Sequence, residues 1–317
     1  MITVFLGAGF SHIGGVPLAH QLFDEEPLVD RVVRARLVNH VLHRWNTWKK
    51  DNQGTPEEYL AYLQDRGGKP WDEANWYVGL VIALKMGVVQ MVGFHPTIIR
   101  HHLTLTSGIA SHESFWTILF QHTYDIGVVT TNYDILAERG LRNEPRPRLP
   151  RPGFNYGFGY EELEGRGFPA RPSFLPVAVS GKVPLLKLHG SISWAIEKGN
   201  LVKYLDCRPA VRGNPAIIAP ITEKKEESYL TATWTRASEV LSTSKLWLIV
   251  GYSLPEYDSL VRDLFVKNSR HQPIIHVLDP NPAIVEKYAS LLPKCKVYPH
   301  PGLPQALSEM SQILAQS

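Results

Sequence analysis

The chain has 317 residues, enough for one large domain with insertions or for two modest domains. A hydrophobic content of 44% and a charged content of 20% are ordinary for a soluble globular protein. The formal net charge is only +3, from 33 basic and 30 acidic side chains, so the sequence does not favour direct nucleic-acid binding.

Cysteine and histidine usage argues against a metal site. Cys207 and Cys295 are the only cysteines and neither belongs to a C-x-x-C pair, which excludes a cysteine-rich zinc site and makes a disulfide framework improbable. The 13 histidines lack a recurrent ligand spacing, so no metal is expected. A reducing compartment and an amino terminus without signal-peptide features predict a cytoplasmic protein.

Short apolar runs that end in small or polar residues are predicted to be strands buried on both faces. They are Ile2–Leu6, Ile126–Thr130, Leu185–Leu188, Leu246–Val250, Ile274–Leu278 and Lys296–Tyr298. Helical patterns are found at Ser259–Lys267, Ala283–Leu292 and Pro304–Ala315. This alternation predicts a doubly wound, Rossmann-like α/β fold with a parallel sheet.

The uneven spacing of the predicted strands indicates insertions within a single domain over residues 1–317. Residues 28–123 are predicted to form an inserted, mainly helical subdomain, because the gap after the first strand is far longer than one crossover needs. Within it, residues 76–94 are nearly all apolar apart from Lys85 and Gln90, which favours a buried helix, with an oligomer interface as a sub-case, over a membrane span.

A second insertion, over residues 139–184, is irregular and rich in proline and arginine. Its first part, Arg139–Arg151, is interpreted as a solvated, semi-rigid loop. A partner or nucleic-acid contact is the alternative.

The first motif is Gly7-Ala8-Gly9-Phe10-Ser11, which follows a strand and precedes a predicted helix start at Pro17–Phe23. Glycines at such a turn let the backbone approach a pyrophosphate, and a helix amino terminus favours negative charge. His12 occupies the third glycine position of the dinucleotide fingerprint, so the motif alone is also compatible with a tight turn. Ser11 can contact phosphate or ribose, or cap the next helix.

Two further motifs lie at the ends of other predicted strands. Thr131, Asn132 and Asp134 follow the second strand, and an asparagine amide can bind ribose hydroxyls or an attacking water. The alternative is a turn in which Asn132 and Asp134 cap a helix. His189 follows the third strand and can act as a base near neutral pH, although a lone histidine is more often structural.

The last two motifs come from the carboxyl-terminal half of the chain. Gly251 and Ser253 follow one strand, and Asp279 follows the next. An acidic side chain at a strand end can bind the hydroxyls of adenosine ribose. Either motif by itself is also explained as turn chemistry.

In this order the five segments resemble the sirtuin family, whose matching segments read G-A-G-x-S, T-Q-N-x-D, L-H-G and G-T-S, followed by a strand end with a ribose-binding polar residue. The resemblance implies NAD as substrate, with Asn132 and His189 catalytic and His189 as the base. It also implies that the other motif residues bind NAD: Gly7, Ala8, Gly9, Phe10, Ser11, Thr131, Asp134, Gly251, Ser253 and Asp279.

The sequence departs from the deacylating members of the family at three points. The four-cysteine zinc module is missing, Leu18 stands where the family has an aspartate, and Thr131 stands where deacylases have glutamine. The segments T-T-N-Y-D, L-H-G-S and G-Y-S-L instead resemble the zinc-free bacterial branch of the family, in which many members act as NAD hydrolases in anti-phage defence.

The resemblance implies hydrolysis of NAD to nicotinamide and ADP-ribose. The alternatives are an NAD-dependent protein deacylase or ADP-ribosyltransferase, and a non-catalytic NAD or ADP-ribose sensor. Because unrestrained NAD hydrolysis would kill the host, we expect a homo-oligomer or a complex with a sensor or ATPase partner. No membrane association is expected.

Overall fold

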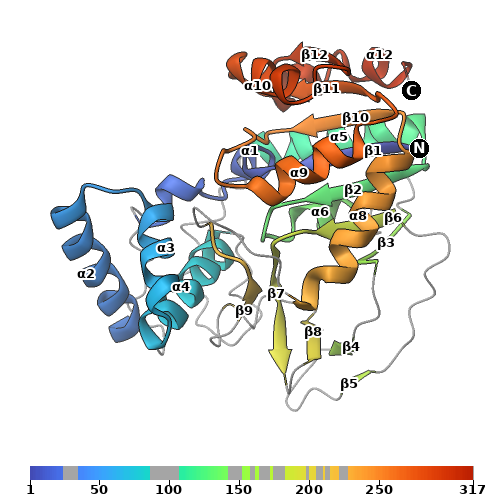
Figure 1. The fold of residues 1–317 in the computed structure, drawn as a ribbon. Helices are drawn as coiled ribbons and strands as arrows, with labels where there is room; N and C mark the ends of the chain where they lie inside the picture. The colour runs from blue at the N-terminus through green and yellow to red at the C-terminus, as the bar shows by residue number, and fades with distance from the viewer. Residues whose placement is uncertain are drawn as a thin grey trace.

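Seven strands form the main sheet of the computed structural model, in the order β12-β11-β10-β1-β2-β6-β3, and all neighbouring strands are parallel (Figure 1). Their bounds are β1 Ile2–Leu6, β2 Ile126–Thr130, β3 Phe154–Asn155, β6 Val183–Lys187, β10 Leu246–Val250, β11 Ile274–Leu278 and β12 Lys296–His300. The chain winds outwards from β1 in both directions, which confirms the predicted doubly wound, Rossmann-like fold.

The structure describes residues 1–23, 35–85, 107–141, 152–157, 161–163, 172–173, 183–197, 200–204, 210, 215–220 and 228–316. Parts of three sequence predictions lie outside these residues. They are residues 86–94 of the apolar run, residues 142–151 of the arginine-rich segment, and Cys207.

Burial explains why the central strands were recognisable in the sequence. All five residues of β1, β2 and β10 are buried, because helices cover both faces of the sheet. The edge strand β12 is largely exposed and contains Pro299, which has no N–H to donate to a neighbouring strand.

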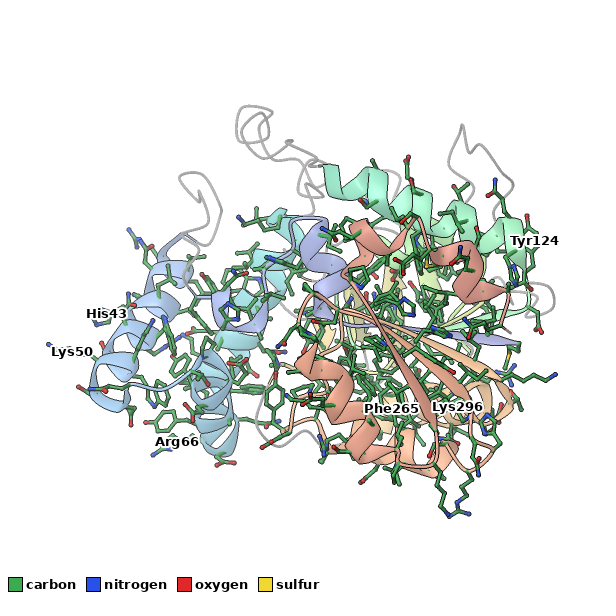
Figure 2. All side chains as sticks on the ribbon, turned by 90° about the horizontal axis from the view of Figure 1, so that it is seen from above. His43, Lys50, Arg66, Tyr124, Phe265 and Lys296 are labelled. Carbon is green, nitrogen blue, oxygen red and sulfur yellow. The ribbon has the colours of Figure 1, made fainter. Side chains whose placement is uncertain are left out.

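Helices from distant parts of the sequence make the two outer layers. Helix α5 (Ser107–His122) packs against α11 (Leu303–Ala306) and α12 (Met310–Leu314) on one side of the sheet. Helices α8 (Thr231–Thr243) and α9 (Ser259–Asn268) pack together on the other side (Figures 1 and 2). The remaining short elements of this layered unit are α1 Ala8–Ile13, η1 Ala19–Gln21, α6 Leu136–Leu141, η4 Ser228–Leu230 and α10 Ala283–Leu291.

Three helices form a separate lobe beside the sheet, α2 Ala35–Asn52, α3 Pro56–Arg66 and α4 Lys69–Lys85 (Figure 1). In Figure 2 the labelled side chains of His43, Lys50 and Arg66 mark this lobe, well apart from Phe265 on α9. Stacked aromatic rings hold it together, with Phe23 at centroid distances of 5.0 Å from Trp45 and 5.3 Å from Tyr77. The lobe supplies the helical insert that the sequence predicted, but α5, which the prediction also placed in the insert, packs with α11 and α12 instead.

A second, mostly antiparallel sheet has the order β5-β4-β8-β7-β9 and was not predicted. Its strands are β4 Glu161–Leu163, β5 Pro172–Ser173, β7 Gly190–Glu197, β8 Asn200–Tyr204 and β9 Pro215–Ile217. Only two residues, Leu188 and His189, separate the end of β6 from the start of β7, so the chain passes directly from one sheet into the other.

Local differences from the sequence predictions have simple physical causes. The predicted helix Pro304–Ala315 is two short helices, α11 and α12. The predicted helix start at Pro17–Phe23 is the single turn η1, because the helix after β1 begins already at Ala8. The apolar segment from Trp76 to Ala83 is buried in α4. None of the described helices is long and apolar enough to cross a membrane.

Candidate functional site

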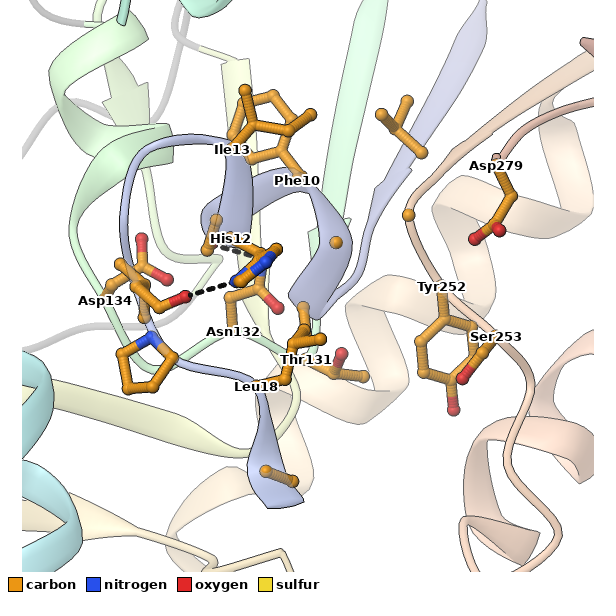
Figure 3. Close-up of a pocket in the computed structure, with 18 of the residues that line it drawn as sticks. Phe10, His12, Ile13, Leu18, Thr131, Asn132, Asp134, Tyr252, Ser253 and Asp279 are labelled. Atoms are coloured by element: carbon orange, nitrogen blue, oxygen red, sulfur yellow. Dashed lines mark hydrogen bonds between the residues drawn. The ribbon is translucent and has the colours of Figure 1, made fainter. Parts of the chain in front are cut away.

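The main cavity lies where the winding of the sheet reverses, at the carboxyl ends of β1 and β10. This is the position at which doubly wound sheets bind ligands. The cavity has a volume of about 550 Å³, within the range typical of small-molecule sites. Figure 3 shows Asn132 and Asp134 at one end and Ser253 and Asp279 at the other.

The structure brings nearly all residues predicted for the site to this cavity. The lining contains the predicted residues Ala8, Gly9, Phe10, Ser11, Thr131, Asn132, Asp134, His189, Gly251, Ser253 and Asp279. Gly7 is the exception, and it lies directly behind the lining as the residue that precedes α1.

The glycines of the first motif are required by contacts between two loops. The Gly9 N–H donates to the carbonyl of Gly251 at 2.8 Å, and a Cβ on Gly7 would lie 2.5 Å from the same carbonyl oxygen. Gly251 itself has φ +62°, and a Cβ there would lie 2.4 Å from the backbone N of Phe10. Close packing of the loops after β1 and β10 therefore explains these glycines without any ligand.

Asn132 is held rigidly at the end of β2. Its side-chain Nδ2 donates to the Gly7 carbonyl at 2.7 Å and to Ser11 Oγ at 2.8 Å. Because the carbonyl can only accept, the NH₂ must face it, which fixes the orientation of the amide. The Oδ1 of Asn132 accepts no hydrogen bond from the described residues, so it is left as an acceptor at the cavity.

Asp134 and a buried ion pair support the same loop. Asp134 Oδ1 accepts from the N–H of Leu136, the first residue of α6, at 2.8 Å, which forms a local turn before the helix. Lys187 Nζ donates to the Asp134 carbonyl and lies 3.0 Å from Glu138 Oε1. Both charged side chains are almost fully buried. Lys187 was not singled out in the sequence, where a lysine ending an apolar strand gives no signal of its role.

His189 lies at the passage between the two sheets and is 2% exposed. Its ring is flanked by Tyr133 and Trp234, at centroid distances of 6.3 and 6.4 Å. Nε2 of His189 lies 3.4 Å from Oδ1 of Asp258, a second residue that the sequence analysis did not single out. Asp258 also lines the cavity.

The far end of the cavity is built on β10 and β11. Asp279 follows β11 and accepts the N–H of Asn281 through Oδ1 at 2.9 Å. Burial raises the pKa of Asp279, while this hydrogen bond opposes the shift. The carboxylate is thus held in place beside Ser253 and Gly251.

Apolar residues from other elements complete the walls, among them Leu22, Ile82 of α4, and Pro220. The sequence did not predict that these residues line the cavity. Ile82, for example, reaches it only because the helical lobe packs beside the sheet. The described lining contains the carboxylates of Asp134, Asp258 and Asp279 and neither lysine nor arginine. The described residues also contain no group of three or more side chains placed to hold a metal ion.

No known family profile and no curated protein matches the chain. Among solved structures it is similar to a mutant Sir2 homologue in complex with 2′-O-acetyl ADP ribose, with a TM-score of 0.47 and 13% identity over 99% of this chain and 90% of that chain. A Sir2 homologue in complex with NAD aligns with a TM-score of 0.45 and 15% identity over 99% of this chain and 88% of that chain. Sir2Tm bound to a propionylated peptide aligns with a TM-score of 0.46 and 11% identity over 100% of this chain and 92% of that chain.

At this level of similarity the site has to be interpreted from its own residues. The fold and the site define a doubly wound α/β protein with a ligand cavity at the topological switch point of its sheet. An oriented amide, a buried histidine and three carboxylates supply its polar chemistry.

Proposed function

We propose that the protein is an NAD hydrolase that cleaves the bond between nicotinamide and ribose, giving nicotinamide and ADP-ribose. The observation that carries the proposal is the fixed amide of Asn132, whose Oδ1 remains as an acceptor in the cavity that His189 also lines. Such an acceptor can hold a water molecule through one O–H, and a neighbouring imidazole can take up the proton that this water loses.

In the proposed reaction the bond between ribose C1′ and the nicotinamide nitrogen breaks, and its electron pair goes to nicotinamide. Nicotinamide leaves as a neutral molecule because it was a pyridinium cation in NAD, and C1′ becomes an oxocarbenium-like cation. The oxygen of a water held by Asn132 forms the new bond to C1′, and His189 takes the proton from that water. Positioning and electrostatic stabilisation supply the rate enhancement.

The charge of the cavity supports a reaction that develops positive charge. Asp134 and Asp258 line the cavity together with Asn132 and His189, and carboxylates stabilise a cation at C1′. They give no attraction to a pyrophosphate, so its binding falls to uncharged donors such as main-chain N–H groups and the hydroxyls of Ser11 and Ser253. The N–H of Ala8, the first residue of α1, has no carbonyl partner among the described residues and is one such donor.

The other end of the cavity fits the adenosine half of the dinucleotide. Asp279 follows a parallel strand and presents an acceptor for ribose hydroxyls. Its negative charge disfavours a 2′-phosphate at the same position. We therefore propose NAD rather than NADP as the substrate.

The biological setting is proposed on the sequence resemblance described above. The similarity of the five motifs to the zinc-free bacterial sirtuin branch supports a role as a cytoplasmic effector of anti-phage defence. An NAD-depleting enzyme needs an off state, which supports control by self-association or by a sensor or ATPase partner. The helical subdomain over residues 28–123 and the segment Arg139–Arg151 are the surfaces we propose for this control.

The test is release of nicotinamide and ADP-ribose from NAD by the purified protein, with and without an acetyl-lysine peptide. We expect release without the peptide, and loss of at least about 100-fold in His189→Ala. The control His40→Ala removes the same side chain from an exposed position on α2 and should keep full activity. Release that occurs only with the peptide, together with deacetylation, would contradict hydrolysis and establish a deacylase.

A further inference from the structure

Asp258 immediately precedes helix α9 and yet does not cap it. Aspartate at this position normally accepts a hydrogen bond from the first turn of the helix, which stabilises the helix. The Asp258 side chain makes no such bond, although the helix has ten residues and begins directly after it. The side chain is instead 1% exposed and turned away from its own helix.

The carboxylate of Asp258 joins two elements of the site. Oδ1 lies 3.4 Å from Nε2 of His189, and Oδ2 accepts the hydroxyl of Tyr252 at 2.8 Å. The carbonyl of Tyr252 in turn accepts the hydroxyl of Tyr288 at 3.1 Å. The aspartate is therefore fixed from the side opposite the histidine.

We propose that Asp258 is the positioning residue of His189, and this inference rests on the proposed function of His189 as a base. The carboxylate favours the ring tautomer that carries its proton on Nε2, so the lone pair of the neutral ring is on Nδ1. It also stabilises the imidazolium that forms when the ring takes the proton from the attacking water.

Asp258 also acts electrostatically on three tyrosines near the site. Tyr133 and Tyr252 have pKa values well above 10.0, and Tyr257 has a pKa of about 12, in each case mainly because of burial. These phenols are neutral at working pH. Two further carboxylates belong to this neighbourhood. Glu57 of α3 acts on Tyr133 and Tyr257, and Asp134 lines the same cavity.

The direct test follows the ring nitrogens of His189 by NMR as a function of pH in the free protein, with His189→Gln to assign the signals. We expect an Nε2–H tautomer in the wild type, and a fall of about one to two units in the pKa of His189 in Asp258→Asn. The control Asp263→Asn makes the same change at an exposed position on α9 and should leave this pKa unchanged. Asp258→Glu keeps the negative charge, so the pKa of His189 should stay close to its wild-type value. An unchanged tautomer and pKa in a folded Asp258→Asn would overturn the proposal.

Kinetics give an independent readout. In Asp258→Asn the kcat for nicotinamide release should fall by about 10- to 100-fold with little change in KM, and the acid limb of the pH profile should move to lower pH. If Asp258 had only a structural role, Asp258→Asn would lower the free energy of unfolding and leave the acid limb of the pH profile in place. That result would contradict the proposal. If the wild type does not hydrolyse NAD, the proposed function fails. The NMR titration still decides whether Asp258 sets the tautomer and the pKa of His189.

Discussion

The seven-stranded sheet and the elements added around it differ in how they contribute to the site. The parallel strands end in short loops that carry Asn132, Asp134 and Asp279, each at the cavity because of its place after a strand. The helical lobe and the second sheet supply walls and constraints instead, such as Ile82 on α4 and the turn into β7 at Gly190. The strand ends therefore hold the reactive groups, and the helical lobe and the second sheet determine how tightly these groups are enclosed.

Breaking the buried ion pair between Lys187 and Glu138 should have the largest effect on the free energy of unfolding. In Lys187→Met the carboxylate of Glu138 stays buried without its partner, so we expect a loss of about 3–5 kcal/mol in the free energy of unfolding, measured with urea. The double variant Lys187→Met/Glu138→Leu removes both charges and should recover part of this loss. Arg236→Met breaks an exposed ion pair and should cost less than about 1 kcal/mol. Similar losses in the buried and exposed single variants would contradict the assigned role of the pair.

The junction between the two sheets provides the next test. Gly190 has φ +80°, and a Cβ there would lie 2.0 Å from the carbonyl oxygen of Ala216 in β9. Gly190→Ala should therefore destabilise the protein by about 2–4 kcal/mol, combining backbone strain with steric overlap. Gly15→Ala has similar strain at φ +90° but open space around it, so a cost of about 1 kcal/mol is expected. Equal thermal shifts in the two variants would show that the sheets are not tightly packed at this point.

The far edge of the main sheet should make the stability depend on pH. Burial, and next the neighbouring His300, lower the pKa of His276 from 6.5 to about 4. Between these values the unfolded chain binds the proton and the folded protein does not, so stability is lost as the pH falls through this window. Urea unfolding at pH 7.5 and 5 should differ by about 2 kcal/mol from this residue.

His276→Gln should remove most of that difference. The exposed His43 on α2 has no such environment, and His43→Gln should leave the pH dependence as it is. A wild-type stability that stays flat between the two pH values would contradict the lowered pKa.

The smallest effect is expected at the adenosine end of the cavity. Asp279→Asn keeps the shape of the side chain but removes the charge that opposes a 2′-phosphate. The preference for NAD over NADP in kcat/KM should fall by about tenfold, or about 1.4 kcal/mol. Asp263→Asn removes a charge from an exposed position and should not change the preference. An unaltered preference in Asp279→Asn would remove this residue from the proposed ribose site.

The sequence was sufficient for the core of the fold because local physical signals were strong there. Strands β1, β2, β10 and β11 have the predicted bounds, since each is a mainly apolar run that ends at or before a glycine, threonine or aspartate. Strand β7 was missed because its identity depends on pairing with β8 and β9, which no local pattern reveals.

The site could be predicted as far as it follows from strand ends. Asn132 and His189 were identified because each directly follows a strand. Asp258 lies in a loop eight residues after β10, and only the folded chain places it beside His189. The role of Lys187 could not be predicted, because it depends on the ion pair with Glu138, which lies on another element.

The central claim is that the oriented amide of Asn132 holds the attacking water in an NAD hydrolase. The most direct measurement is the rate of nicotinamide release from NAD by the wild type and Asn132→Ala, beside Asn39→Ala, which removes the same side chain from an exposed position on α2. The account predicts that Asn132→Ala lowers kcat by about 100-fold or more while Asn39→Ala keeps the wild-type rate. A folded Asn132→Ala protein that releases nicotinamide at the wild-type rate would contradict it.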